Sequence, residues 1–184
     1  LTDQSTSFLV HYLKAQQGAI FVLKEDEEEK PFLEMISCYA FDRKKFESKR
    51  IYVGDGVVGQ TFLEGVTTKM RQIPQGYTSI TSGLGHATPD CLLVVPLKFN
   101  DQVKAIFEVA SFHDFSDSEI SFIEKAGEFI ASAITSAENT ERTNHLLEEF
   151  KVQAEQTRAQ EEELRQNMEE LEATQEEMKR KERE

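Results

Sequence analysis

The sequence predicts an α+β domain built on an antiparallel sheet, followed by one long helix. Short apolar runs bounded by glycines and turn residues recur through the first 112 residues, as is typical of strands. From Asp117 to Glu184 there is no proline, and Gly127 is the only glycine, which favours an uninterrupted helix. The charge density also changes: residues 1–137 carry a net charge of −6, and the shorter segment 138–184 carries −7. We therefore expect two domains, 1–137 and 138–184.

The N-terminal part predicts a helix followed by a β-hairpin. Apolar residues with helical spacing lie within residues 6–17, and Gly18 is expected to end that helix. The apolar run 19–23 predicts a buried strand, and residues 32–41 predict its partner. The acidic residues 25–29 between the strands predict a loop, because neighbouring carboxylates repel one another in a sheet.

The middle of the chain predicts short elements around a long loop. Residues 50–53 form a third strand, residues 54–56 a turn, and residues 57–63 a short helix that ends at Gly65. A brief extended piece is expected at residues 67–70. Residues 71–90 are rich in Gly, Pro, Ser and Thr, which predicts a long irregular loop. Loops of this length inside a compact domain are usually functional or mobile.

A second hairpin and a capped helix complete the predicted domain. Residues 92–99 and 102–112 form the two strands, and Asn100 and Asp101 form the turn. The second strand places Val103, Ala105, Phe107 and Val109 on one face, with Lys104, Ile106, Glu108 and Ala110 on the other. Ser116 and Glu119 have the spacing of a capping box, which predicts the start of the long helix.

Four sequence strings, in this order and spacing, resemble the GAF domain family. They are Gly18-Ala-Ile-Phe-Val-Leu23, Val53-Gly-Asp-Gly-Val-Val-Gly59, Leu93-Val-Val-Pro-Leu97 and Phe115-Ser-Asp117. The resemblance covers residues 1–137. It implies a central antiparallel sheet of about six strands, with the helices of the two termini on one face. It also implies a ligand pocket on the other face, under the short helix and the irregular loop.

The resemblance further implies a sensory input domain rather than an enzyme. Such domains bind ligands of many kinds, so the fold does not name the ligand or any cofactor. The second strand and the loop meet at the family's pocket, and the residues expected to line it are Tyr39, Phe41, Tyr77, His86 and Cys91. Fragments of a cyclic-nucleotide signature occur at Asn100, Lys104, Phe112 and Asp117, but without its spacing.

The C-terminal segment predicts a coiled coil with a homodimeric partner. A heptad register places seven apolar residues at ten seam positions: Leu147, Phe150, Ala154, Leu164, Met168, Leu171 and Met178. Thr157, Glu161 and Gln175 occupy the other three seam positions. A helix that is polar on nearly all sides needs a partner to be stable. The string around Leu164 and Leu171 is similar to connectors that precede PAS domains in bacterial chemoreceptors and histidine kinases. That similarity implies a parallel pair leading to a downstream output domain in a longer parent chain.

Two rival functions remain open at this stage. Cys91 follows Gly85-His86-Ala87 in a region similar to that of free methionine sulfoxide reductases, which use thiols at this place. A solvent-exposed Cys91 of low pKa is the discriminating observation. The second rival is a purely structural dimerisation module whose pocket is filled by its own side chains.

Charge and cysteine content restrict the partners. The net charge of −13 disfavours nucleic acid and direct contact with anionic membranes, because both need a basic surface. The short basic cluster at residues 43–50 is flanked by Asp42 and Glu47 and is expected to be a solvated loop. Two cysteines outside any CxxC motif predict neither a disulfide nor a zinc site and fit a reducing cytoplasm.

Overall fold

The computed structural model describes residues 2–25, 30–40, 43–44, 49–74, 76–82 and 85–181. The chain divides into two compact units, residues 1–136 and residues 137–184. Helix α3, Asp117–Lys181, belongs to both units. No helix in the described ranges has an apolar stretch long enough to span a membrane.

The first unit is built on a curled antiparallel sheet, as predicted. Its strand order is β3-β2-β1-β9-β8-β5, and β4 also pairs with β2, so the described strands occupy six positions across the sheet. The strands are β1 (Gln17–Lys24), β2 (Phe32–Ala40), β3 (Arg43–Lys44), β4 (Arg50–Tyr52), β5 (Thr68–Met70), β8 (Cys91–Phe99) and β9 (Gln102–Ser111). The two predicted hairpins, β1–β2 and β8–β9, are both confirmed.

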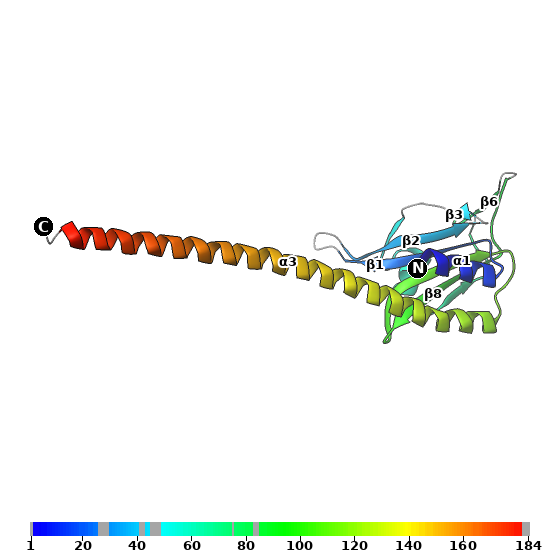
Figure 1. Ribbon diagram of the computed structural model, residues 1–184. Helices are drawn as coiled ribbons and strands as arrows, with labels where there is room; N and C mark the ends of the chain where they lie inside the picture. The colour runs from blue at the N-terminus through cyan, green and yellow to red at the C-terminus, as the bar shows by residue number, and fades with distance from the viewer. Residues whose placement is uncertain are drawn as a thin grey trace. The chain divides into compact units, whose positions relative to one another are not determined.

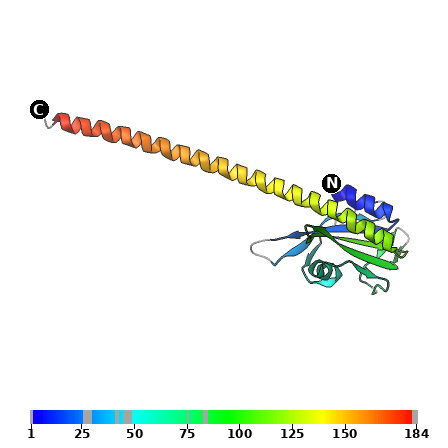
Figure 2. The same ribbon diagram turned by 90° about the horizontal axis from the view of Figure 1, so that it is seen from below.

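Two faces of the sheet carry separate apolar clusters. Helix α1 (Thr2–Tyr12) and the first turns of α3 lie side by side over one face (Figure 1). The cluster on this face includes Leu9, Phe107 and Ile123. The short helix α2 (Gly56–Glu64) lies on the opposite face (Figure 2), with Phe21, Val58 and Ile106 in its cluster. From Ala105 to Ala110, alternate residues of β9 belong to the two clusters, since successive side chains of a strand point to opposite faces. Val103, predicted on the face of Ala105, packs instead against the α2-face cluster, because the β8–β9 register shifts between Leu97 and Lys98.

The structure corrects two further predictions of the sequence. Helix α1 ends at Tyr12, and Gly18 lies inside β1 instead of ending the helix. A Cβ atom at Gly18 would come within 2.6 Å of Val10 Cγ2, so glycine here permits α1 to approach the sheet closely. The segment 71–90 is not wholly irregular either. It contains the paired strands β6 (Ile80–Ser82) and β7 (Gly85–Ala87).

The predicted end of α2 and the predicted start of α3 are confirmed. Helix α2 ends at Gly65, whose φ of 65° is the left-handed conformation of a helix C-cap. The backbone N–H of Ser116 donates to Glu119 Oε2 over 2.8 Å, and the Glu119 N–H donates to Ser116 Oγ over 3.4 Å. This reciprocal pair is the predicted capping box, and it starts α3 at Asp117. The turn residues Asn100 and Asp101 both have positive φ, as a two-residue hairpin requires.

Candidate functional site

A pocket of about 300 Å³ lies on the α2 face of the sheet. Its walls come from the end of the β2–β4 connection, from β4, from the first turn of α2 and from the segment before β6. Its lining residues are Lys49, Arg50, Ile51, Tyr52, Asp55, Gly56, Val57, Val58, Tyr77, Thr78 and Glu108. The pocket thus lies on the face that the family resemblance implies, beside the short helix and the 71–90 segment.

Glu108 is the chemically distinctive residue of this pocket. It lies on β9, a central strand, between the fully buried Phe107 and Val109. Burial raises the pKa of the Glu108 carboxyl, and the positive charge of Lys49 only partly offsets that effect. Within the described part of the chain, no hydrogen bond or ion pair involves this side chain. A half-buried carboxyl without a hydrogen-bond partner costs stability, and groups with perturbed pKa values cluster at functional sites.

Polar groups from three other elements face the same space. Burial and the charge of Glu108 raise the pKa of the Tyr77 hydroxyl, and the backbone of Val57 lowers it. Gln17 Nε2 on β1 donates to Thr78 Oγ1 over 3.0 Å, which ties the segment before β6 to the sheet. The first turn of α2 presents backbone N–H groups, and Asp55 at its N-cap makes no side-chain capping bond. The pocket therefore offers hydrogen-bond donors and acceptors around one half-buried acid.

The structure separates the four described residues among the five predicted to bind the ligand. Tyr77 lines the pocket. Tyr39 packs against the cluster on the α1 face, and its hydroxyl lies 3.3 Å from His11 Nε2. His86 is exposed on β7, and Cys91 is buried in the α1-face cluster. Phe41 lies outside the described residues.

Sequence reasoning missed Glu108 although a signal was present. Glu108 is the single acid within the apolar strand Ala105–Ala110, on the face that it shares with Ile106 and Ala110. An acid at a position that the alternation assigns to a buried face is an exception that points to function.

Cys91 does not have the features of a reactive thiol. Its side chain is 1% exposed. Burial raises the pKa of the thiol, and the neighbouring Asp114 adds to this, while the backbone of Phe115 and the charge of Lys69 act in the opposite direction. The other thiol, Cys38, packs on the opposite face of the sheet. A thiol that stays protonated and shielded is a poor nucleophile.

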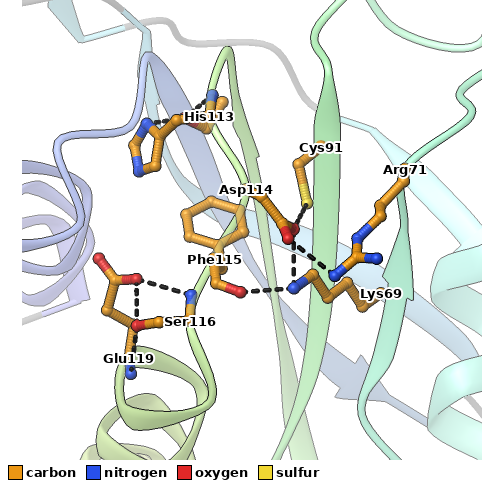
Figure 3. Close-up of polar contacts among 9 residues, drawn as sticks. Lys69, Arg71, Cys91, His113, Asp114, Phe115, Ser116 and Glu119 are labelled. Atoms are coloured by element: carbon orange, nitrogen blue, oxygen red, sulfur yellow. Dashed lines mark hydrogen bonds and ion pairs between the residues drawn. The ribbon is translucent and has the colours of Figure 1, made fainter.

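Asp114 forms the centre of a polar cluster beside Cys91 (Figure 3). Its carboxylate accepts from Lys69 Nζ at 2.7 Å and pairs with Arg71 Nη2 at 2.8 Å. Cys91 Sγ lies 3.6 Å from the same carboxylate. Lys69 Nζ also donates to the backbone carbonyl of Phe115. Lys69 and Arg71 together lower the pKa of Asp114 to about 2. Among the residues that the structure describes, no group of acidic, histidine and cysteine side chains is arranged to hold a metal ion.

The low pKa of Asp114 makes a prediction about acid stability. A carboxyl with a depressed pKa stabilises the fold above its ordinary pKa, 3.8, and that stabilisation is lost as the pH falls through about 2. We expect Asp114→Asn to be less stable than the unmodified chain at pH 7, with the difference shrinking between about pH 4 and pH 2. Urea denaturation at several pH values measures it. A difference that stays constant down to pH 2 would contradict the assignment.

Comparison with known proteins supplies the family. The sequence profile of the GAF domain matches residues 1–135. The chain therefore belongs to the GAF domain family. A search of curated protein sequences finds no match to this chain.

Solved structures of low sequence identity share the fold. The GAF domain of an Acinetobacter phosphoenolpyruvate-protein phosphotransferase is 16% identical, with a TM-score of 0.59, and the match covers 75% of this chain and 82% of that one. The GAF-B domain of DevS from Mycobacterium smegmatis is 17% identical, with a TM-score of 0.59, covering 77% of this chain and 96% of that one. A type II free methionine-R-sulfoxide reductase from Thermoplasma acidophilum is 14% identical, with a TM-score of 0.56, covering 73% and 89%. GAF domains and a reductase thus share this fold, and the fold alone does not assign a function to this chain.

Proposed function

We propose that this chain is a sensory module that binds a small polar ligand in the pocket on the α2 face. The observation that carries the proposal is the half-buried Glu108 carboxyl, which forms no hydrogen bond or ion pair with the described side chains and lines a pocket of about 300 Å³. A ligand that presents a hydrogen-bond donor, above all a protonated amine, would satisfy this acid and remove the cost of its burial.

A sensory role agrees better with the thiols than the reductase role does. Reductase activity is a property of the Thermoplasma protein. The same activity in this chain would require a reactive cysteine. Cys91 is buried beside the Asp114 carboxylate, and Cys38 lies on the other face of the sheet. Neither thiol lines the pocket that contains Glu108. We therefore propose binding without catalysis.

The long helix supports the second half of the proposal, transmission through a parallel homodimer. All seven apolar seam residues are exposed in the isolated chain, and the large ones range from 53% exposed for Leu147 to 65% for Phe150. Such a stripe on a polar helix needs an apolar partner, and a second copy supplies an identical stripe. The proposed output is a downstream domain in the same parent chain. The acidic composition and the two free thiols support a cytoplasmic location.

Native mass spectrometry of the purified chain, with a visible absorption spectrum of the same sample, tests ligand binding. We expect a dimer with a non-covalent adduct whose mass identifies the ligand. In Glu108→Gln the adduct is expected to be lost. The same substitution is expected to raise the free energy of unfolding at pH 7 by about 0.5–2 kcal/mol. The sign follows from the raised pKa: the stability associated with Glu108 is present below its ordinary pKa and is lost as the pH rises through the raised value.

Glu128→Gln is the matched control. It removes the same charge from an exposed position on α3 and is expected to leave both the adduct and the stability unchanged. Retention of the adduct by Glu108→Gln would remove Glu108 from the binding site. An adduct-free dimer in the unmodified chain would favour the purely structural module.

A further inference from the structure

Strand β5 contacts the pocket helix on one side and the start of α3 on the other. On its α2 side, Thr68 Oγ1 accepts from Thr61 Oγ1 of α2 at 2.9 Å, and Met70 packs against the α2-face cluster. The alternate residues face the other way. Thr67 Oγ1 donates to Glu124 Oε1 of α3 at 2.5 Å, and Lys69 reaches Asp114 and Phe115. The period of two in an extended strand explains this division.

Lys69 joins β5 to the segment from which α3 begins. Its side chain is only 20% exposed, so its ammonium needs compensating partners, and it has two: the Asp114 carboxylate and the Phe115 carbonyl (Figure 3). Phe115 is itself 1% exposed, and the next residue, Ser116, caps α3. A displacement of Lys69 therefore acts directly on the N-terminus of α3.

The position of β5 in the sheet allows it to move more easily than the central strands. It is three residues long, it lies at the sheet edge, and β8 is its one partner strand among the described residues. Strands β8, β9 and β1 each have neighbours on both sides. A short edge strand loses few hydrogen bonds when it shifts, whereas a central strand would break two ladders.

We propose that β5 couples the pocket to α3. On the α3 side the coupling contact is made by Lys69, and on the α2 side it is made by Thr68 and Met70. The inference rests on the proposed sensory function. Residues Asp55–Val58 of α2 form one wall of the pocket, so a ligand that displaces this helix shifts Thr61. The shift passes to Thr68 and then, through Lys69, to Asp114 and Phe115. The coupling uses an element in direct contact with both helices, and networks of packed side chains and hydrogen bonds of this kind carry coupling between sites.

Hydrogen exchange in the ligand-free chain tests this coupling. The quantity measured is the cross-effect, the change in amide exchange in the helix on one face of β5 when a contact on its other face is removed. Thr68→Val removes the contact on the α2 side, and we expect faster amide exchange in residues 117–124 of α3. Lys69→Met removes the contacts with Asp114 and Phe115 on the α3 side, and we expect faster amide exchange in residues 56–64 of α2. Each cross-effect is expected to be about fivefold or more, the lower end of typical coupling between sites.

Thr174→Val and Lys125→Met are the matched controls, because both residues are exposed, the Thr174 hydroxyl donates to the Glu170 carbonyl of its own helix, and Lys125 forms no hydrogen bond or ion pair with the described residues of β5. Neither is expected to change exchange in α2. If each β5 variant accelerates exchange only on its own side, the two faces of β5 are independent and the proposal is wrong. Should Lys69→Met fail to fold by circular dichroism, Thr67→Val takes its place with the same expectation for α2.

This experiment and the test of ligand binding can fail separately. Cross-effects without any adduct in native mass spectrometry would keep the coupling and overturn the sensory function. An adduct without cross-effects would keep the sensory function and overturn β5 as its route to α3.

Discussion

Gly59→Ala is expected to lower the free energy of unfolding by about 1–3 kcal/mol and to abolish ligand binding. A Cβ atom at this position would lie 2.5 Å from the Tyr52 carbonyl oxygen and 2.9 Å from the Gly54 backbone nitrogen. Both neighbours are backbone atoms, so no side-chain rotation relieves the clash. The helix must move away from β4, and the pocket walls formed by Tyr52 and by Asp55–Val58 then separate.

The expected loss of stability in Gly59→Ala is opposite in sign to the usual effect of replacing glycine by alanine in a helix. In an ordinary helix, alanine is more stable than glycine by about 0.5–1 kcal/mol, because glycine loses more conformational freedom on folding. Thermal or urea denaturation of Gly59→Ala decides between the two signs. Gln60→Ala, at the next and exposed position of α2, is the control and is expected to change stability by less than about 0.5 kcal/mol. A more stable Gly59→Ala would show that α2 does not need its close contact with β4.

The double substitution Leu164→Glu and Leu171→Glu is expected to convert the proposed dimer to monomer. Truncating a buried leucine costs about 2–5 kcal/mol, so two charged replacements should cost about 4 kcal/mol or more, close to a thousandfold in the dissociation constant. Helicity should fall as well, because a long polar helix is marginal without its partner. Sedimentation equilibrium and circular dichroism measure the two effects.

The matched control places the same charges on the outer face of the coil. Gln166→Glu and Ala173→Glu lie two residues away from the substituted leucines, at positions that face solvent in the heptad register. They are expected to leave the dimer intact. Oxidation of Ala154→Cys tests orientation, because equivalent seam residues face each other only in a parallel pair. A monomer at micromolar concentration before any substitution would remove the basis of the transmission mechanism.

Local sequence chemistry predicted the secondary structure well wherever neighbouring residues decide it. The Asn100–Asp101 turn, the Gly65 C-cap and the Ser116–Glu119 capping box are all present, because each depends on residues within a few positions of one another. The end of α1 was predicted wrongly for the opposite reason. Gly18 has the composition of a helix stop, but its role is to admit Val10 of the neighbouring helix, a contact that only packing reveals.

The residues of the candidate site likewise depended on packing more than on local sequence. Tyr39 and Tyr77 both looked like pocket aromatics, and the structure places Tyr39 on the α1 face and Tyr77 in the pocket. The face that a residue occupies depends on strand register. The irregularity between Ile20 and Phe21 in the β1–β2 pairing shifts that register along β2. Such a shift exchanges the two faces of a strand, and the alternation of one isolated sequence does not locate it.

By itself, the sequence determined an α+β domain followed by one long helix with an apolar stripe, because periodicity, turns and caps are local properties, and four strings along the chain carried the resemblance to the GAF family. Tertiary structure alone decided that Glu108, Tyr77 and the first turn of α2 share one pocket. It also decided that Lys69 meets Asp114 and Phe115, some 45 residues further along the chain. These contacts depend on which strands become neighbours and which faces they present. That outcome is set by the burial of the whole sheet between its helices, and no single segment encodes it.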